Sequence, residues 1–161
     1  MTTLGNKRNI KEYTNDDTAA TPVLSVRLLS EQAIAPCRKT AGAAGFDLSA
    51  LENVCLLPRT VTQIRTGLAI ALPPDTYGRI AARSSLALRA ISVMAGVVDM
   101  DYRGELICVL CNHTESVIRL PRGSRIAQLI VEKICIPKIE VCRTLPDTGR
   151  GRGGFGSSGC Y

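Results

Sequence analysis

The run Val61-Thr-Gln-Ile-Arg-Thr-Gly-Leu-Ala-Ile-Ala-Leu72 is one of seven short apolar or alternating stretches that decide the fold class of this chain. The other six occupy residues 23–29, 54–57, 77–82, 105–112, 117–120 and 125–134, and Gly, Pro and Asp residues separate them. Short strands that recur between such turn residues are typical of a β-sandwich or a β-barrel. The sequence therefore predicts an all-β fold.

One segment favours a helix instead. Residues 84–90, Ser-Ser-Leu-Ala-Leu-Arg-Ala, open with residues that cap helices and continue with good helix formers. The length of the segment predicts about two helical turns.

The chain of 161 residues has the length of a single domain, and its 45% hydrophobic content is enough for a substantial core. Residues 1–22 are polar and lack an apolar period, which predicts a flexible leader. Residues 23–146 hold the predicted strands and form the β domain. Residues 147–161 are rich in glycine, so they form either a disordered tail or a C-terminal arm that orders on a ligand.

The formal net charge of +6 fits nucleic acid, an acidic membrane surface or a phosphorylated small molecule. The arginines near glycine and serine stand singly, without a basic stripe or interleaved aromatic residues. This distribution favours a small phosphorylated ligand over stable nucleic-acid binding. No apolar stretch approaches the roughly 20 residues that span a bilayer, so we expect no membrane association.

Seven cysteines are an odd count, and no secretory signal precedes them. Both observations argue against a disulfide framework and for a reducing, intracellular compartment, the cytoplasm or the nucleus. Cys108 and Cys111 have the spacing of a metal motif, but they lie in a predicted strand where positions three apart point to opposite faces. The sequence thus predicts no protein metal cluster, and any metal must arrive with the substrate.

The glycine-rich C-terminal segment has the composition of a phosphate cradle. Glycines leave backbone N–H groups able to point at an anion, arginines add charge and serines add hydroxyl donors. An aromatic residue among these donors suits a nucleotide whose base it covers. The residues concerned are Arg150, Arg152, Phe155, Ser157 and Ser158. The alternative is a basic glycine-rich linker without a ligand.

A second candidate cradle is Arg83-Ser84-Ser85, at the start of the predicted helix. Unpaired N–H groups, the positive end of the helix dipole and a guanidinium converge there, which favours an anion. The alternative is an ordinary helix cap beside a surface arginine.

The turn-rich run Gly96-Val-Val-Asp99-Met-Asp101-Tyr102-Arg103-Gly104 predicts a hairpin with two carboxylates near its tip. Asp99 follows two valines and is the better candidate for a general base, because partial enclosure suits that role. Asp101 is expected to pair with an arginine or to support the turn. The lone His113 is expected at a surface or a turn, and Arg125 and Gln128 are polar positions in an otherwise apolar strand that need partners.

Five segments in this order resemble the five motifs of the trimeric dUTPase family. The segments are Ala44-Gly-Phe-Asp-Leu48, Arg83-Ser-Ser-Leu-Ala87, Gly96 through Glu105, Arg125-Ile-Ala-Gln-Leu129 and Arg150 through Gly159. Five ordered matches make a specific signal. The resemblance implies a jelly-roll-like subunit with one short helix, assembled as a homotrimer with shared active sites. The C-terminal arm of one chain would close over the site of a neighbour.

The resemblance implies an enzyme that hydrolyses dUTP to dUMP and pyrophosphate with Mg²⁺ held by the triphosphate. This activity limits uracil incorporation into DNA and supplies dUMP for thymidylate synthesis. Asp99 would activate the water that attacks the α-phosphorus in line. The hairpin from Val93 through Gly96 and Val98 to Tyr102 would receive deoxyuridine, with Tyr102 under the deoxyribose, where it excludes a 2′-hydroxyl.

The same resemblance implies roles for the remaining site residues. The inner phosphate contacts would be Arg83, Ser84, Ser85 and Gln128. The outer phosphate contacts would be Arg150, Gly156, Ser157 and Ser158, with Phe155 as the lid over uracil. Asp47 and Asp101 would give structural or turn support.

Three positions depart from the family pattern. Ser85 stands where glycine is usual, Ser157-Ser158 replaces Ser-Thr, and Arg152 occupies a position where a small residue is common. Two alternatives belong to related folds: a dCTP deaminase, which lacks the arm with its phenylalanine, and a signalling or scaffold protein that has lost catalysis.

Overall fold

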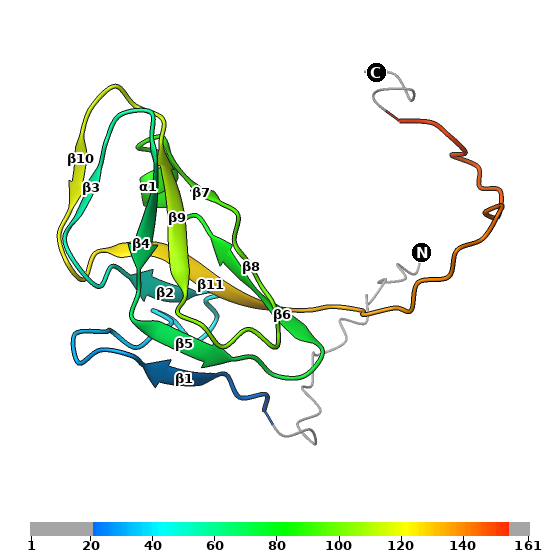
Figure 1. Cartoon of the computed structure of the whole chain (residues 1–161), viewed down its shortest axis with the longest axis horizontal. Coiled ribbons are helices and arrows are strands. Elements are labelled where there is room, and N and C mark those ends of the chain that lie inside the picture. Colours follow the sequence, from blue (N-terminus) through cyan, green and yellow to red (C-terminus); the bar gives the residue numbers. More distant parts are fainter. Residues whose placement is uncertain (1–20, 155–161) are drawn as a thin grey trace, which may run out of the picture.

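The computed structural model describes residues 21–154, and these residues form eleven strands and one short helix. The all-β prediction is confirmed (Figure 1). The elements are β1 (Ser25–Leu28), β2 (Phe46–Ser49), β3 (Val54–Leu56), β4 (Val61–Arg65), β5 (Leu68–Ala71), β6 (Thr76–Ala81), α1 (Ser84–Ala87), β7 (Ile91–Met94), β8 (Val97–Val98), β9 (Ile107–Asn112), β10 (Ile118–Leu120) and β11 (Arg125–Lys133).

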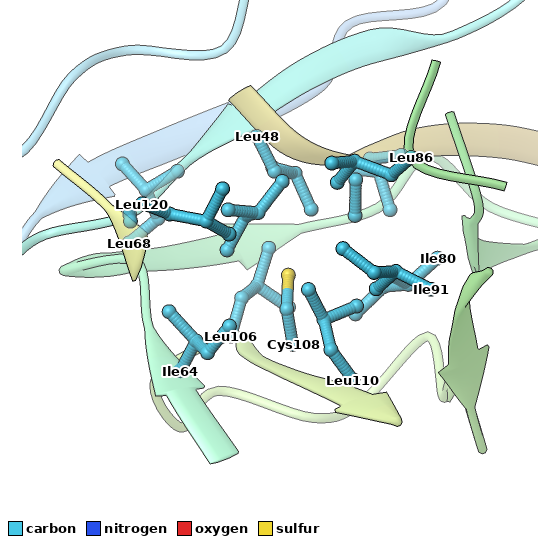
Figure 2. Packing of buried hydrophobic residues seen from close by; sticks show 14 of the residues in the cluster. Leu48, Ile64, Leu68, Ile80, Leu86, Ile91, Leu106, Cys108, Leu110 and Leu120 are labelled. Atoms are coloured by element: carbon cyan, nitrogen blue, oxygen red, sulfur yellow. The ribbon is translucent and has the colours of Figure 1, made fainter. Parts of the chain in front are cut away.

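Two larger sheets face each other across the core, and two strand pairs complete the jelly-roll-like body. One large sheet has the order β2-β11-β6-β8, and the other has the order β4-β9-β7. The pairs are β1-β5 and β10-β3. Figure 2 shows Leu48 and Leu86 on one side of the core opposite Ile64, Cys108 and Leu110 on the other.

Alternation along β9 explains how one strand serves both the core and the surface. Cys108, Leu110 and Asn112 point inward and are at most 1% exposed, whereas Cys111 is only partly buried. The two cysteines therefore lie on opposite faces, as predicted from a strand period of two. Burial raises the pKa of the Cys108 thiol to about 12, because desolvation disfavours the thiolate.

Two local predictions were wrong. The run 61–72 is two strands, because the chain bends at Gly67, whose φ is +70°. The helix is a single turn, and Arg83 is its N-cap without a side-chain capping bond. The predicted hairpin is present, since β7 and β9 pair antiparallel on either side of the run 96–104, but β8 within the connection pairs with β6 of the other sheet.

The segment that follows β11 leaves the body of the molecule. Figure 1 shows this segment, in orange, running away from the strands. The Ile134 N–H donates to the Asp75 backbone oxygen at 3.0 Å, and the described residues after it make no further backbone hydrogen bond to the body. Beyond this point Ile139 and Val141 are 93% and 95% exposed. None of the helices in the described residues is long and apolar enough to cross a membrane.

Asn112 is a buried polar residue that joins β9 to two loops. Its Nδ2 donates to the backbone oxygens of Leu56, Leu57 and Ser116 at 2.9 to 3.1 Å. Its Oδ1 accepts from the backbone N–H and the hydroxyl of Thr114 at 3.0 and 2.8 Å. Every polar atom of this side chain is therefore paired in the interior, where an unpaired group is costly.

We expect Asn112→Asp to lower the free energy of unfolding by about 3 kcal/mol, because a carboxylate would face three carbonyl oxygens without a donor to offer them. Chemical denaturation at fixed protein concentration measures the change. Asn53→Ala is the matched control, since Asn53 makes one exposed bond, from Arg122 N to its Oδ1 at 2.9 Å. Equal denaturation midpoints for Asn112→Asp and the unaltered chain would contradict the expectation.

Candidate active site

An apolar cavity of about 330 Å³ opens between β6, β7, β8 and the start of β9. We call it the apolar cavity; its lining residues are Ile80, Val93, Met94, Ala95, Gly96, Val97, Val98, Asp99, Tyr102, Glu105, Leu106, Ile107 and Val109. Five of them, Val93, Gly96, Val98, Asp99 and Tyr102, are residues to which the sequence assigned nucleoside binding or catalysis.

The turn between β7 and β8 shapes this cavity. Ala95 and Gly96 both have positive φ, +59° and +118°. The Gly96 oxygen accepts from Ile80 N at 2.8 Å, and a Cβ at Gly96 would lie 2.6 Å from the Ile80 oxygen. Glycine is needed because the chain passes directly over β6 in a conformation that side chains disfavour.

The loop after β8 carries Asp99 and Tyr102 at the cavity wall. Asp99 is exposed in this chain, so the partial enclosure expected for a base is not supplied by its own chain. Tyr102 N donates to the backbone oxygen of Asp99 at 3.1 Å, and the Tyr102 hydroxyl donates to the backbone oxygen of Glu105 at 3.0 Å. Arg103 fixes the turn through Nη1, which donates to the backbone oxygens of Met100 and Tyr102 at 2.7 and 2.9 Å.

Asp101, the other carboxylate of this loop, is exposed. The hydrogen bonds that hold the turn come from Arg103 and from backbone groups.

A second cavity of about 220 Å³ is basic. We call it the basic cavity; its lining residues are Lys39, Ala43, Gly45, Asp47, Arg83, Ser84, Arg125 and Gln128. Three basic side chains and one carboxylate face it, a balance that attracts a polyanion such as a phosphate chain.

Asp47 holds two guanidinium groups in place beside the basic cavity. Arg83 Nε donates to Asp47 Oδ1 at 3.1 Å, and Arg125 Nη1 donates to Oδ2 at 2.8 Å. Arg83 Nη1 also donates to the Arg125 backbone oxygen at 3.0 Å. The Asp47 carboxylate is only 15% exposed, so both arginines are ordered before any ligand binds.

The strand register explains why these residues meet. Gln128 of β11 lies directly between Asp47 of β2 and Ala81 of β6. Its Nε2 donates to the Ala82 oxygen at 3.0 Å, one residue before Arg83. Ser84 lines the cavity from α1, whereas Ser85 is exposed and is not among the lining residues.

The candidate residues thus fall into two cavities that share no lining residue. Arg150 is exposed, and its Nε donates to the Gly153 oxygen at 2.9 Å within a local turn of the outgoing segment. Phe155, Gly156, Ser157 and Ser158 lie outside the described residues. Sequence reasoning did not assign Lys39, Glu105 or Arg125 to the site, although the polar position of Arg125 in an apolar strand was a usable signal.

His113 has a partner that its sequence position did not indicate. Its Nε2 lies 2.8 Å from Ser92 Oγ, and its Nδ1 lies 3.8 Å from Cys111 Sγ. None of the three residues lines either cavity.

Comparisons with known proteins identify the family. A model of the dUTPase family matches residues 31–159. The deoxyuridine 5'-triphosphate nucleotidohydrolase of Paramecium bursaria Chlorella virus 1 is 49% identical over 137 residues, which is 84% of this chain and 97% of that protein. The enzyme of the same name from Mus musculus is 47% identical over 132 residues, 81% of this chain and 82% of that protein.

A similar solved structure agrees with these matches. A mutant dUTPase of Staphylococcus bacteriophage 80alpha with dUpNHpp has a TM-score of 0.80 and 27% identity, and the alignment covers 86% of this chain and 99% of that one. The family match, the named relatives and the similar solved structure agree, so the chain belongs to the dUTPase family and is a dUTP diphosphatase.

Proposed function

We propose that the chain hydrolyses dUTP at active sites that three copies share, by in-line attack of a water molecule on the α-phosphorus. The separation of the two cavities is the observation that carries this proposal. One chain places Asp99 and Tyr102 in the apolar cavity and Arg83 and Gln128 in the basic cavity, with no common lining residue. A substrate that must contact both sets is served by the apolar cavity of one copy and the basic cavity of another.

Asp99 is the proposed general base. Its carboxylate accepts a proton from the water as the oxygen forms a bond to the α-phosphorus. The bond from the α-phosphorus to the bridging oxygen breaks, and pyrophosphate leaves. The exposure of Asp99 in the single chain leaves it accessible to a phosphate group held by a neighbouring copy.

The basic cavity is the proposed phosphate site. Arg83 and Arg125 are pre-ordered by Asp47, so little side-chain entropy is lost when a phosphate binds. Ser84 adds a hydroxyl and a backbone N–H at the start of α1. Ser85, which is exposed beside it, remains a proposed inner phosphate contact through its backbone.

The proposed substrate is the Mg²⁺ complex of dUTP, in which the metal enters with the triphosphate. Residues 21–154 contain no group of three or more His, Cys, Asp or Glu side chains placed to hold a metal ion. The carboxylate that lines the basic cavity, Asp47, already accepts from two arginines. Mg²⁺ that arrives with the triphosphate would offset the charge that develops on the leaving pyrophosphate.

The apolar cavity is the proposed nucleoside site. The backbone from Val93 to Val98 would read the edge of uracil, and a tight fit would reject the methyl group of thymine. Tyr102 would pack under the deoxyribose and exclude a 2′-hydroxyl. The 44% exposure of Tyr102 leaves its ring available for that contact.

The outgoing C-terminal segment is the proposed lid of a neighbouring site. Residues after Ile134 run away from their own body in Figure 1. This course fits an arm that delivers Arg150 to another copy, and Phe155 with Gly156, Ser157 and Ser158 would follow. The resulting dUMP would be available for thymidylate synthesis, and removal of dUTP would limit uracil in DNA.

The cysteines support a reducing compartment as the place of action. The six cysteines of the described residues are all free thiols, and Cys37, Cys55, Cys135 and Cys142 are exposed. Exposed thiols persist where the glutathione pool keeps them reduced.

The test of the activity is an assay of the purified chain with dUTP, UTP, dCTP and dTTP in the presence of Mg²⁺, which follows pyrophosphate and the nucleotide product. We expect dUMP and pyrophosphate from dUTP and little product from the other three. Deamination of dCTP, or equal rates with all four nucleotides, would contradict the proposal.

We expect Asp99→Asn to keep assembly and dUTP binding and to lower kcat by at least about a hundredfold, because the amide cannot accept the proton of the attacking water. Steady-state kinetics and binding of a non-hydrolysable dUTP analogue measure the two effects. Asp75→Asn is the matched control, since Asp75 lies outside both cavities and its φ of +57° tolerates asparagine.

Mixed trimers extend this test to the sharing of sites. When Asp99→Asn and Arg83→Gln chains are refolded together, some sites in each mixed trimer combine an intact Asp99 with an intact Arg83 from another copy. Activity should then exceed that of either variant alone. If each site came from one chain, every site would carry one defect and the mixture would stay inactive.

We expect Tyr102→Ala to reduce the preference for dUTP over UTP by at least about tenfold, because the smaller side chain admits the ribose hydroxyl. The measured quantity is the ratio of kcat/KM for the two nucleotides. Tyr77→Ala is the control, because Tyr77 bonds to Glu132 outside both cavities. An unchanged ratio in Tyr102→Ala would show that another group guards the sugar.

We expect truncation after Asp147 to preserve the β core and assembly while lowering dUTP hydrolysis by at least about tenfold, because the outer phosphate donors and the lid are lost. Kinetics and size-exclusion chromatography measure these effects. With Mg²⁺ and a non-hydrolysable analogue, the full chain should resist protease cleavage near Arg150 and Arg152, and Phe155→Ala should weaken that protection. Equal rates for the truncated and full chains at all dUTP concentrations would refute the lid.

A further inference from the structure

Glu105 connects the wall of the apolar cavity to the bend between β4 and β5. Its Oε1 accepts from Gly67 N at 2.8 Å, and its Oε2 accepts from Arg65 Nε at 3.0 Å. The Glu105 side chain is only 18% exposed. A partly buried carboxylate that accepts from a backbone N–H and a guanidinium is held in one position.

The backbone of the same residue holds the active-site tyrosine. The Tyr102 hydroxyl donates to the Glu105 oxygen at 3.0 Å. The Tyr102 ring lies so close to Gly104 that a Cβ there would be 2.6 Å from its Cζ. Tyr102 therefore has its orientation set at both ends, by the chain at Asp99 and by its hydroxyl at Glu105.

The next residue ties this point to the core. Leu106 is 1% exposed, and its N–H donates to the Leu68 oxygen at 2.7 Å. The Leu106 oxygen accepts from Thr66 Oγ1 at 2.7 Å. The loop from Asp99 to Arg103 is in contrast exposed or half-buried and is held mainly by local bonds. Residues 105–106 are thus the fixed end of a loop that is otherwise at the surface.

We propose that Glu105 is a positioning residue for nucleoside selection, which acts by fixing the carbonyl oxygen that anchors the Tyr102 hydroxyl. This inference rests on the proposed role of Tyr102 as the barrier to a 2′-hydroxyl. The Tyr102 ring can exclude a 2′-hydroxyl only if it is held in place, because a ring that can move away admits the larger sugar. The carboxylate of Glu105 supplies that rigidity through the bend at Gly67.

The chemistry of the two contacts predicts how substitutions rank. Alanine removes both carboxylate acceptors at residue 105. The backbone at this position is then no longer held through the side-chain bonds to Gly67 N and Arg65 Nε. Glutamine keeps a carbonyl oxygen that accepts from Gly67 N and loses the charge that pairs with Arg65, which is 57% exposed. An exposed arginine contributes little through its charge, so glutamine should preserve most of the effect.

The test compares kcat/KM for dUTP and UTP in the intact chain and in Glu105→Ala, Glu105→Gln and Tyr102→Phe. We expect Glu105→Ala and Tyr102→Phe each to reduce discrimination by about tenfold, with KM for dUTP raised more than kcat is lowered. Glu105→Gln should stay within about threefold of the intact chain, and the double variant Glu105→Ala/Tyr102→Phe should lose no more than either single one.

Glu115→Ala is the matched control, because Glu115 also pairs with an arginine, Arg59, at 2.6 Å, and lies outside both cavities. Its discrimination should equal that of the intact chain. A purely structural role of Glu105 would lower the amount of folded protein without changing the dUTP to UTP ratio of the folded fraction.

The outcomes separate this inference from the proposed role of Tyr102. If Tyr102→Ala lowers discrimination but Glu105→Ala and Tyr102→Phe leave it unchanged, the positioning role is wrong and the sugar barrier stands. If Tyr102→Ala also leaves it unchanged, the barrier itself is wrong and the inference fails with it. Should Glu105→Ala not fold, Tyr102→Phe decides, because it removes the same anchoring contact without altering the bend, and unchanged discrimination in it overturns the inference.

Discussion

The pairing of β11 with β2 on one edge and β6 on the other is the constraint on which both the core and the basic cavity depend. Ile126, Ala127 and Leu129 of β11 are fully buried, so the strand cannot shift by one residue without turning them to solvent. The same register fixes Gln128 between Asp47 and Ala81. Burial of apolar side chains thus places the polar groups that surround the phosphate site, and no separate interaction is needed to align them.

Two different kinds of interaction shape the two cavities. The basic cavity is rigid because its carboxylate, Asp47 of β2, binds Arg125 of β11 and Arg83 at the N-cap of α1. The apolar cavity exists because the chain turns at Gly96 and sends β7 and β8 to different sheets. The ion pairs of Asp47 fix the basic cavity, whereas the backbone turn at Gly96 shapes the apolar cavity. Substitutions in the two cavities should therefore affect substrate binding in different ways.

The sequence predicted the fold class, but it did not predict which distant segments meet in the folded chain. Alternating and apolar runs are local, and they identified most strands and the placement of Cys108 and Cys111 on opposite faces of one of them. The partners of β7 and β8 depend on long-range packing, which no local pattern contains. The helix was overestimated because its propensity continues to Ala90, whereas the chain adopts a positive φ of +56° there.

The predicted site lacked the residues that other elements bring to it. Lys39 reaches the basic cavity from a loop without a motif-like pattern. Arg125 is held at the cavity by its bond to Asp47, which lies 78 positions away in the sequence. Buried Cys108 has a different consequence. Its thiol is 0% exposed with a pKa of about 12, so at neutral pH it is neither accessible nor ionised, whereas Cys37 and Cys55 are exposed. Alkylation of this one sulfur therefore requires the sandwich to open around β9, so the reactivity of the native side chain reports local opening of the core.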